Sequence, residues 1–190
     1  MKRMRKAGAG FTLIELLVVI TIIGLLAAII IPSIAGALKS AKRARAMSQV
    51  KDLDGAVKRY FAEYGRMPVP AGQNGGADRL YTGSDQAKVI EILINVNTNE
   101  NTRKIVFLDL DPASFKGSDG KPLKTVAEML AQLKSGTPYQ DPWGTDYGIL
   151  MDLNFDEKIS GTAFGDIRAK SAVYSGGEAK NVTDPPYKTW

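Results

Sequence analysis

The feature that most constrains this chain is a long apolar run near its start, residues 11–31, with Glu15 as its only charged residue. As an α-helix this run spans roughly 31 Å, about one hydrocarbon thickness of a bilayer. The ten residues before it are basic and include four Lys or Arg. A lone carboxylate in hydrocarbon costs roughly 3 kcal/mol, so Glu15 requires a partner or a function.

Two ordinary explanations account for part of this pattern. A secretory signal peptide has a basic start and an apolar core, followed by small-residue cleavage. The run here is longer than an ordinary signal core, and it continues past Pro32 into an Ala-rich helical pattern without an obvious loop. A plain single-pass membrane anchor explains every feature except Glu15.

Residues 10–20 read Gly-Phe-Thr-Leu-Ile-Glu-Leu-Leu-Val-Val-Ile. This segment closely resembles the class III signal of type IV pilins and pseudopilins. The resemblance implies that a prepilin peptidase cuts between Gly10 and Phe11 on the cytoplasmic side and then N-methylates Phe11. The leader differs mildly from the family at residues 7–9, Ala-Gly-Ala, where a basic residue is more usual.

The same resemblance implies assembly roles for three residues of the run. Glu15 would recruit the next subunit, and Gly24 and Pro32 match the family's helix-weakening positions. The cut leaves Phe11 with a cationic amine. An amine and a carboxylate that are each unfavourable in low dielectric largely compensate when they pair across an interface. Such a pair also fixes the axial register of neighbouring subunits.

Composition argues against an enzyme. At 190 residues the chain has room for one membrane helix and one modest domain. It has no Cys, which excludes a disulfide framework, and no His, which removes the commonest general base and the commonest metal ligand. No nucleophile–base pair stands out in the sequence.

The net charge of +5 is unevenly distributed. Residues 1–51 hold nine Lys or Arg against one Glu, whereas residues 52–190 hold sixteen against nineteen Asp or Glu. The basic part lies where lipid headgroups are expected, so we expect no nucleic-acid partner. Because Lys39, Lys42, Arg43 and Arg45 follow the apolar run, the positive-inside rule alone gives no orientation. The family resemblance implies a cytoplasmic leader and a periplasmic domain.

The sequence predicts an α+β, pilin-like fold, in which a long N-terminal transmembrane helix packs on a small antiparallel β-sheet. We divide the chain into a leader (1–10), the long helix (11–64, transmembrane over 11–31) and a periplasmic α+β domain (65–190) with an extended insert at about 71–137. Helical spacing gives the second half of the long helix one apolar stripe, and Gly65 is a C-terminal cap. The stripe contains Leu53, Val57, Tyr60, Phe61 and Tyr64.

Periodicity and turn residues place shorter elements within the domain. We expect a flexible loop at 71–78, followed by a mixture of helices and strands. The expected helices span 85–95 and 125–134, and the expected strands span 104–110, 147–153 and 169–175.

A second resemblance narrows the family. Residues 58–68, KRYFAEYGRMP, resemble the helix-end motif of the major pseudopilins of type II secretion systems. Residues 141–147, DPWGTDY, resemble their turn into the first sheet strand, and we expect Trp143 to pack against the long helix. Residues 172–177, with Asp184 and Trp190, resemble their last strand and terminal loop. The middle block is longer than in a plain major pseudopilin.

Two loops raise the question of calcium. Asp152, Asn154 and Asp156 offer oxygen atoms at alternating positions, like the start of an EF-hand loop. The sixth position of that pattern, normally Gly, is Glu157, and the twelfth, normally Glu, is Ala163. A polar β-turn explains the stretch equally well.

The second candidate is implied by the resemblance to major pseudopilins, which bind calcium in a C-terminal loop. The matching loop here, residues 175–190, offers only Glu178 and Asp184 as acids. Calcium at either loop stays open at this point.

The predicted function is a structural subunit of a type II secretion pseudopilus, which polymerises through its N-terminal helix to drive export of folded proteins across the outer membrane. The expected partners are other copies of the chain, minor pseudopilins, the prepilin peptidase, the inner-membrane secretion platform and membrane lipid. A pilin subunit of a type IV pilus or DNA-uptake filament is the alternative. A membrane-anchored binding or sensor module that never polymerises is a further hypothesis.

Overall fold

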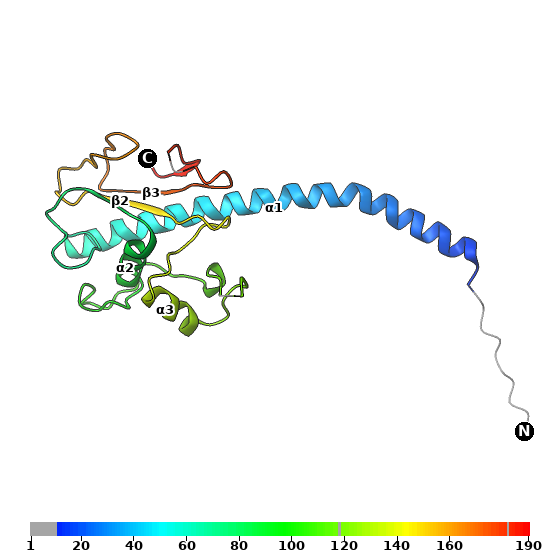
Figure 1. The fold of residues 1–190 in the computed structure, drawn as a ribbon, viewed down its shortest axis with the longest axis horizontal. Helices are drawn as coiled ribbons and strands as arrows, with labels where there is room; N and C mark the ends of the chain where they lie inside the picture. The colour runs from blue at the N-terminus through cyan, green and yellow to red at the C-terminus, as the bar shows by residue number, and fades with distance from the viewer. Residues whose placement is uncertain (1–10, 118, 182) are drawn as a thin grey trace, which may run out of the picture. The chain divides into compact units, whose positions relative to one another are not determined.

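The structure, a computed structural model, describes residues 11–117, 119–181 and 183–190. Its elements follow the order α1, β1, α2, a 3-10 helix η1, α3, β2, β3 and β4 (Figure 1). The chain divides into two compact units, Met1–Ala41 and Lys42–Trp190. The first half of α1 makes up the described part of the first unit. The second half of α1 belongs to the second unit.

Helix α1 runs from Leu13 to Tyr64 and is 52 residues long. It begins two residues after the predicted start at Phe11. It ends where Gly65 takes a φ of 66°, in the left-handed region that favours glycine. The backbone N–H of Gly65 donates to the carbonyl of Phe61 at 2.8 Å, which satisfies one carbonyl of the last turn.

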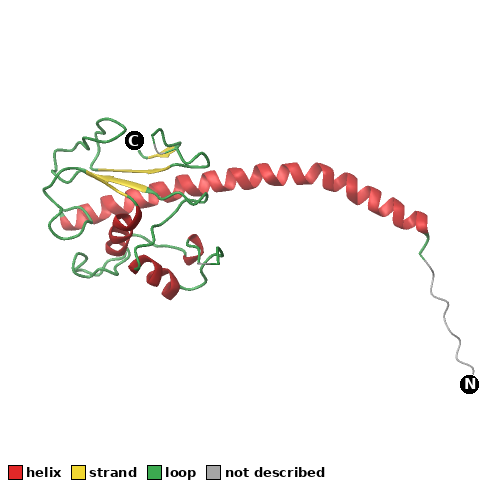
Figure 2. Ribbon diagram, in the orientation of Figure 1, coloured by secondary structure: helices red, strands yellow, loops and turns green. Residues whose placement is uncertain are grey.

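The second unit contains a four-stranded antiparallel sheet in the order β1-β2-β3-β4. The sheet and the helices around it form the α+β architecture that the sequence predicts (Figure 2). The strands are β1 Arg79–Tyr81, β2 Gly148–Met151, β3 Ser171–Ser175 and β4 Tyr187–Lys188. The other elements are α2 Gly83–Leu93, η1 Pro112–Ser114 and α3 Val126–Lys134.

The two faces of the sheet are buried against different parts of the domain. Ile149, Met151 and Val173 belong to the same buried cluster as Leu53, Val57 and Tyr60 of the α1 stripe. Their strand neighbours Leu150 and Ala172 belong to a second cluster on the other face. This alternation follows from the two-residue period of a strand. The second half of α1 therefore covers one face, and the loops after β2 cover the other.

Polar contacts fasten α1 to the rest of the second unit. Asp54, which is 7% exposed, accepts a hydrogen bond from the hydroxyl of Ser171 on β3 at 2.6 Å. The hydroxyl of Tyr60 donates to the carbonyl of Glu100 at 2.8 Å, within the predicted insert. The guanidinium of Arg59 donates to the carbonyl of Phe107, also in the insert, at 2.7 Å. The insert therefore lies along the second half of α1.

Two local predictions were wrong. Residues 104–110 contain no strand, although Phe107 and Leu108 are buried. Their backbone N–H groups both donate to the carbonyl of Leu93, at 2.8 and 3.2 Å, so the segment wraps the end of α2 as an irregular loop. Trp143 does not pack on α1 as expected. It stacks on Tyr187 of β4, with ring centroids 5.6 Å apart.

Candidate processing and assembly site

The first turn of α1 places Glu15 against Thr12. The backbone N–H and the hydroxyl of Thr12 both donate to Oε2 of Glu15, at 2.8 and 2.7 Å. In return, the backbone N–H of Glu15 donates to the hydroxyl oxygen of Thr12 at 3.2 Å. This reciprocal pattern is a capping box, with Thr12 as the N-cap residue. The cap fixes the orientation of the Glu15 carboxylate at the very start of the helix.

The cap occupies only one carboxylate oxygen. Among the described residues, Oε1 of Glu15 accepts no hydrogen bond. Both Glu15 and Thr12 are exposed. A carboxylate presented in this way has a free oxygen for a cation supplied from outside the chain. The geometry therefore suits the recruiting role that the sequence implies for Glu15.

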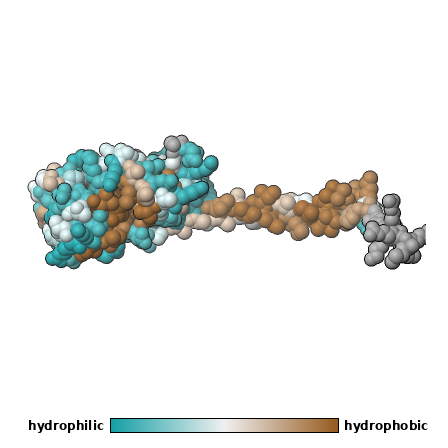
Figure 3. Space-filling view, turned by 90° about the horizontal axis from the view of Figure 1, so that it is seen from below, coloured by the Kyte–Doolittle hydropathy of each residue, from teal (hydrophilic) through white to brown (hydrophobic). Residues whose placement is uncertain are grey.

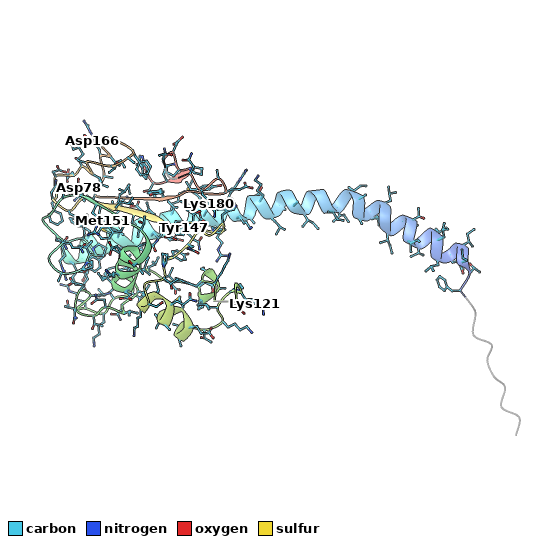
Figure 4. The ribbon with its side chains drawn as sticks, viewed as in Figure 1. Asp78, Lys121, Tyr147, Met151, Asp166 and Lys180 are labelled. Atoms are coloured by element: carbon cyan, nitrogen blue, oxygen red, sulfur yellow. The ribbon has the colours of Figure 1, made fainter. Side chains whose placement is uncertain are left out.

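The apolar side chains around Glu15 are also uncovered. In α1 up to Leu38, the exposed large apolar side chains have exposed fractions from 45% at Val19 to 82% at Leu13. Most of this part of the helix has the brown of hydrophobic residues in Figure 3, and Figure 4 shows its side chains pointing away from the helix axis. By length and composition, α1 is able to cross a membrane, and its most apolar stretch has a mean hydropathy of 3.0 with 0% buried. Such a surface requires lipid or other subunits as its partner.

The structure describes some of the other predicted residues of this site and not others. Gly10, on the leader side of the predicted cleavage position, lies outside the described residues. Phe11 directly precedes the Thr12 cap and is 77% exposed. A Cβ atom on Gly24 would meet nothing within 4 Å, so the subunit itself does not require glycine there. Helix α1 continues through Pro32, whose side chain lies outside the described part.

The first predicted calcium loop uses its oxygen atoms internally. Asp152 is 1% exposed, and its two carboxylate oxygens accept from the backbone N–H groups of Phe155 and Glu157, at 2.6 and 2.8 Å. The side-chain amide of Asn154 donates to Asp156 at 3.2 Å. Phe155 and Glu157 have φ values of 64° and 63°. These contacts are those of a tight polar turn.

The second predicted calcium loop holds one acid in an ion pair. Oδ1 of Asp184 lies 3.3 Å from Nζ of Lys188. Glu178 is exposed. Within residues 11–117, 119–181 and 183–190, no group of three His, Cys, Asp or Glu side chains is placed to hold a metal ion. Calcium at either loop stays a prediction, and this geometry does not favour it.

Comparison with known proteins identifies the family of the chain. Residues 5–31 match the family described as the prokaryotic N-terminal methylation motif. The chain is 34% identical over 151 residues to the type II secretion system core protein G of Aeromonas hydrophila, covering 80% of this chain and 78% of the relative. It is 27% identical over 150 residues to the core protein G of Vibrio cholerae, covering 79% and 75%. The chain belongs to the type II secretion system core protein G family.

This pseudopilin also resembles a pilin over a shorter stretch. It is 42% identical over 64 residues to the type IV major pilin protein PilA of Myxococcus xanthus, which covers 34% of this chain and 29% of the relative. No solved structure matches the chain. The long matches to core protein G cannot be confined to α1, which has 52 residues, so they also extend over the domain.

Sequence reasoning missed the structural role of Thr12, which caps α1 and bonds the Glu15 carboxylate. The signal was available, because a Thr followed three residues later by a Glu, just before an apolar run, is the pattern of a capping box. Glu15 stands out in the sequence as the lone charge of the apolar run, whereas Thr12, which bonds its carboxylate, carries no charge.

Proposed function

We propose that this pseudopilin is a structural subunit of a type II secretion pseudopilus, and that it polymerises through α1 to drive export of folded proteins across the outer membrane. The observation that carries the proposal is the start of α1. There, among the described residues, only one oxygen of the Glu15 carboxylate accepts hydrogen bonds, and the apolar helix that follows it is exposed. The similarity to core protein G over most of the chain supports the secretion system over other uses of such a helix.

Assembly begins with processing. A prepilin peptidase cuts between Gly10 and Phe11, and Phe11 is then N-methylated. Removing residues 1–10 removes four of the twenty-five Lys and Arg residues and none of the twenty Asp and Glu residues. The cut also creates the cation that assembly requires, because the new amine lies four residues before Glu15 in every subunit.

The amine of Phe11 in one subunit then pairs with Glu15 of its neighbour. Oε2 of Glu15 stays on the Thr12 cap, and Oε1 accepts from the incoming amine. A pair in low dielectric is favourable only with good geometry and satisfied lone pairs. The cap meets that condition by holding the carboxylate in one orientation. Gly24 and Pro32 act in the same helix by letting its packing adjust between the membrane and the filament.

The location and the other partners follow from this role. The chain is a single-pass protein of the bacterial inner membrane, with residues 65–190 in the periplasm. Its partners are further copies of itself, minor pseudopilins, the prepilin peptidase and the inner-membrane secretion platform. The α1 surface also contacts membrane lipid before assembly.

A surface pilin or a DNA-uptake subunit is the second candidate, and the match to PilA favours it. That match covers about a third of the chain, whereas the two long matches to core protein G cover about four fifths. Deletion of the gene distinguishes the two functions. Loss of the gene should leave secreted proteins in the periplasm, and the wild-type gene should restore their release. Normal secretion with lost surface motility or DNA uptake would establish the pilin function instead.

A further inference from the structure

The charges that flank the apolar part of α1 are spaced more widely than the hydrocarbon core of a bilayer is thick. Between Glu15 and Lys39 there are 23 consecutive residues without Asp, Glu, Lys or Arg. All of them belong to α1, and both flanking charges are exposed. At 1.5 Å per residue, the two charged positions are about 36 Å apart along the helix, whereas the hydrocarbon core is about 30 Å thick. A tilt of about 20° shortens this span to about 34 Å, still longer than the core.

A free subunit can therefore keep both charges out of hydrocarbon at once. Glu15 and its Thr12 cap then lie at one headgroup layer, and Lys39 lies at the other. Lys42 and Arg43 follow Lys39 at the three- and four-residue spacing that places side chains on one side of a helix. Both are exposed. We call Lys39, Lys42 and Arg43 the basic collar.

We propose that Glu15 and the basic collar bracket the bilayer in the unassembled subunit and limit how far it moves along the membrane normal. The collar binds headgroup phosphates on the domain side and stops the helix from sliding inward. Glu15 lies among the headgroups on the leader side and stops the helix from sliding outward. Between these stops the helix has about 6 Å of free travel.

This bracket rests on the proposed function and adds a condition on assembly. Outward movement beyond the free travel draws the Glu15 carboxylate into hydrocarbon, where a lone charge is unfavourable. A neighbour's Phe11 amine removes that penalty by pairing with it. A subunit therefore leaves the membrane readily only when another subunit is in place to receive Glu15. The carboxylate that recruits a neighbour also holds back an unpaired subunit.

Membrane depth tests this proposal directly. The chain has no Cys, so a single cysteine at Leu16 or Leu38 takes one spin label. Depth is read in phospholipid vesicles, from the collision rates of the label with oxygen and with a polar nickel complex. The full mature chain is used at a high lipid-to-protein ratio, which keeps subunits apart. We expect both wild-type labels at the edges of the hydrocarbon, because the two positions are about 33 Å apart along the helix.

Two variants separate the two stops. Glu15→Gln should move the Leu16 label toward the bilayer centre by several ångströms and leave the Leu38 label outside it. Replacing the collar by K39Q/K42Q/R43Q should move the Leu38 label inward instead. K42Q/R43Q should show a smaller shift of the same kind. The control K121Q/K124Q/K134Q removes three exposed charges from the domain and should leave both labels in place.

A Leu16 label deep in hydrocarbon in the wild type would overturn the proposal, as would unchanged depths in both variants. If the collar variant keeps its depth but loses cross-linking between copies, the collar is a subunit contact and the lipid assignment is wrong. The depth measurement uses isolated subunits. It can therefore fail while filaments still form, which keeps it distinct from a failure of the proposed function.

Discussion

Thr12 and Glu15 cap each other across the first turn of α1, with two hydrogen bonds from Thr12 to Oε2 of Glu15 and one in return. This relationship gives the Glu15 carboxylate a fixed direction before any partner arrives. It also leaves Oε1 without a hydrogen bond from a described residue. The proposed assembly mechanism depends on both properties, so the cap is the first feature to test.

Replacing Thr12 by Val should weaken assembly without unfolding the domain. The change removes the hydroxyl that bonds Glu15, and losing an N-cap costs about 1 kcal/mol of helix stability. Fewer filaments should be recovered by shearing and pelleting, and Thr12→Ser should restore them. Thr21→Val is the matched control, because the Thr21 hydroxyl donates only to its own helix, at the carbonyl of Leu17. Equal loss in both variants would show that the cap has no special role.

The mature chain should begin with N-methyl-Phe11. Mass spectrometry of protein extracted from membranes should find this terminus and no leader peptide. Cleavage before the apolar run keeps the membrane helix, whereas signal peptidase would remove it. An intact Met1, or a terminus beyond Ile31, would rule out prepilin processing.

The domain should lose stability in alkaline solution. Burial raises the pKa of Tyr60 from 10.0 to about 12, because desolvation disfavours the phenolate. The folded state therefore keeps the proton longer than the unfolded state. The stability from neutral Tyr60 is full below pH 10 and is lost as pH rises toward 12. Tyr60→Phe should lower the melting temperature at pH 7, because it removes the bond to Glu100, and should flatten the alkaline decline. Parallel declines in both proteins would contradict this assignment.

Millimolar calcium should change the melting temperature of this pseudopilin little. Both oxygens of Asp152 are already bonded to backbone N–H groups, and Asp184 is paired with Lys188. An ion that binds only the folded state would raise the melting temperature. If a rise occurs, Asp152→Ala with Asp156→Ala should abolish it for the first loop. Glu178→Ala with Asp184→Ala should abolish it for the second.

The long helix and both of its ends were predictable from the sequence because they depend on long patterns. The apolar run, the stripe at Tyr60 and the cap at Gly65 each follow from helical geometry. The helices α2 and α3 follow from the same period, to within about two residues at each end. The position of Glu15 in the run led to the prediction that it is an assembly residue, and that role stays a prediction.

The sheet was harder to predict because its edges are short. Strands β1 and β4 have three and two residues, too few for an alternating pattern to be recognised. The segment at 104–110 resembles a strand, but its buried residues Phe107, Leu108 and Leu110 are apolar because they fill the core beside the end of α2. The Trp143 ring stacks on Tyr187 of β4, so its packing partner could not be predicted without that two-residue strand.

The most direct test of the central claim is the recovery of filaments from cells that carry Glu15→Ala as the only copy. The account predicts normal processing, a folded domain, few sheared filaments and secreted proteins trapped in the periplasm. Glu157→Ala, which removes an exposed carboxylate from the domain, should behave as wild type. Wild-type levels of filaments and secretion in Glu15→Ala would contradict pairing between Glu15 and a neighbouring Phe11 amine as the basis of assembly.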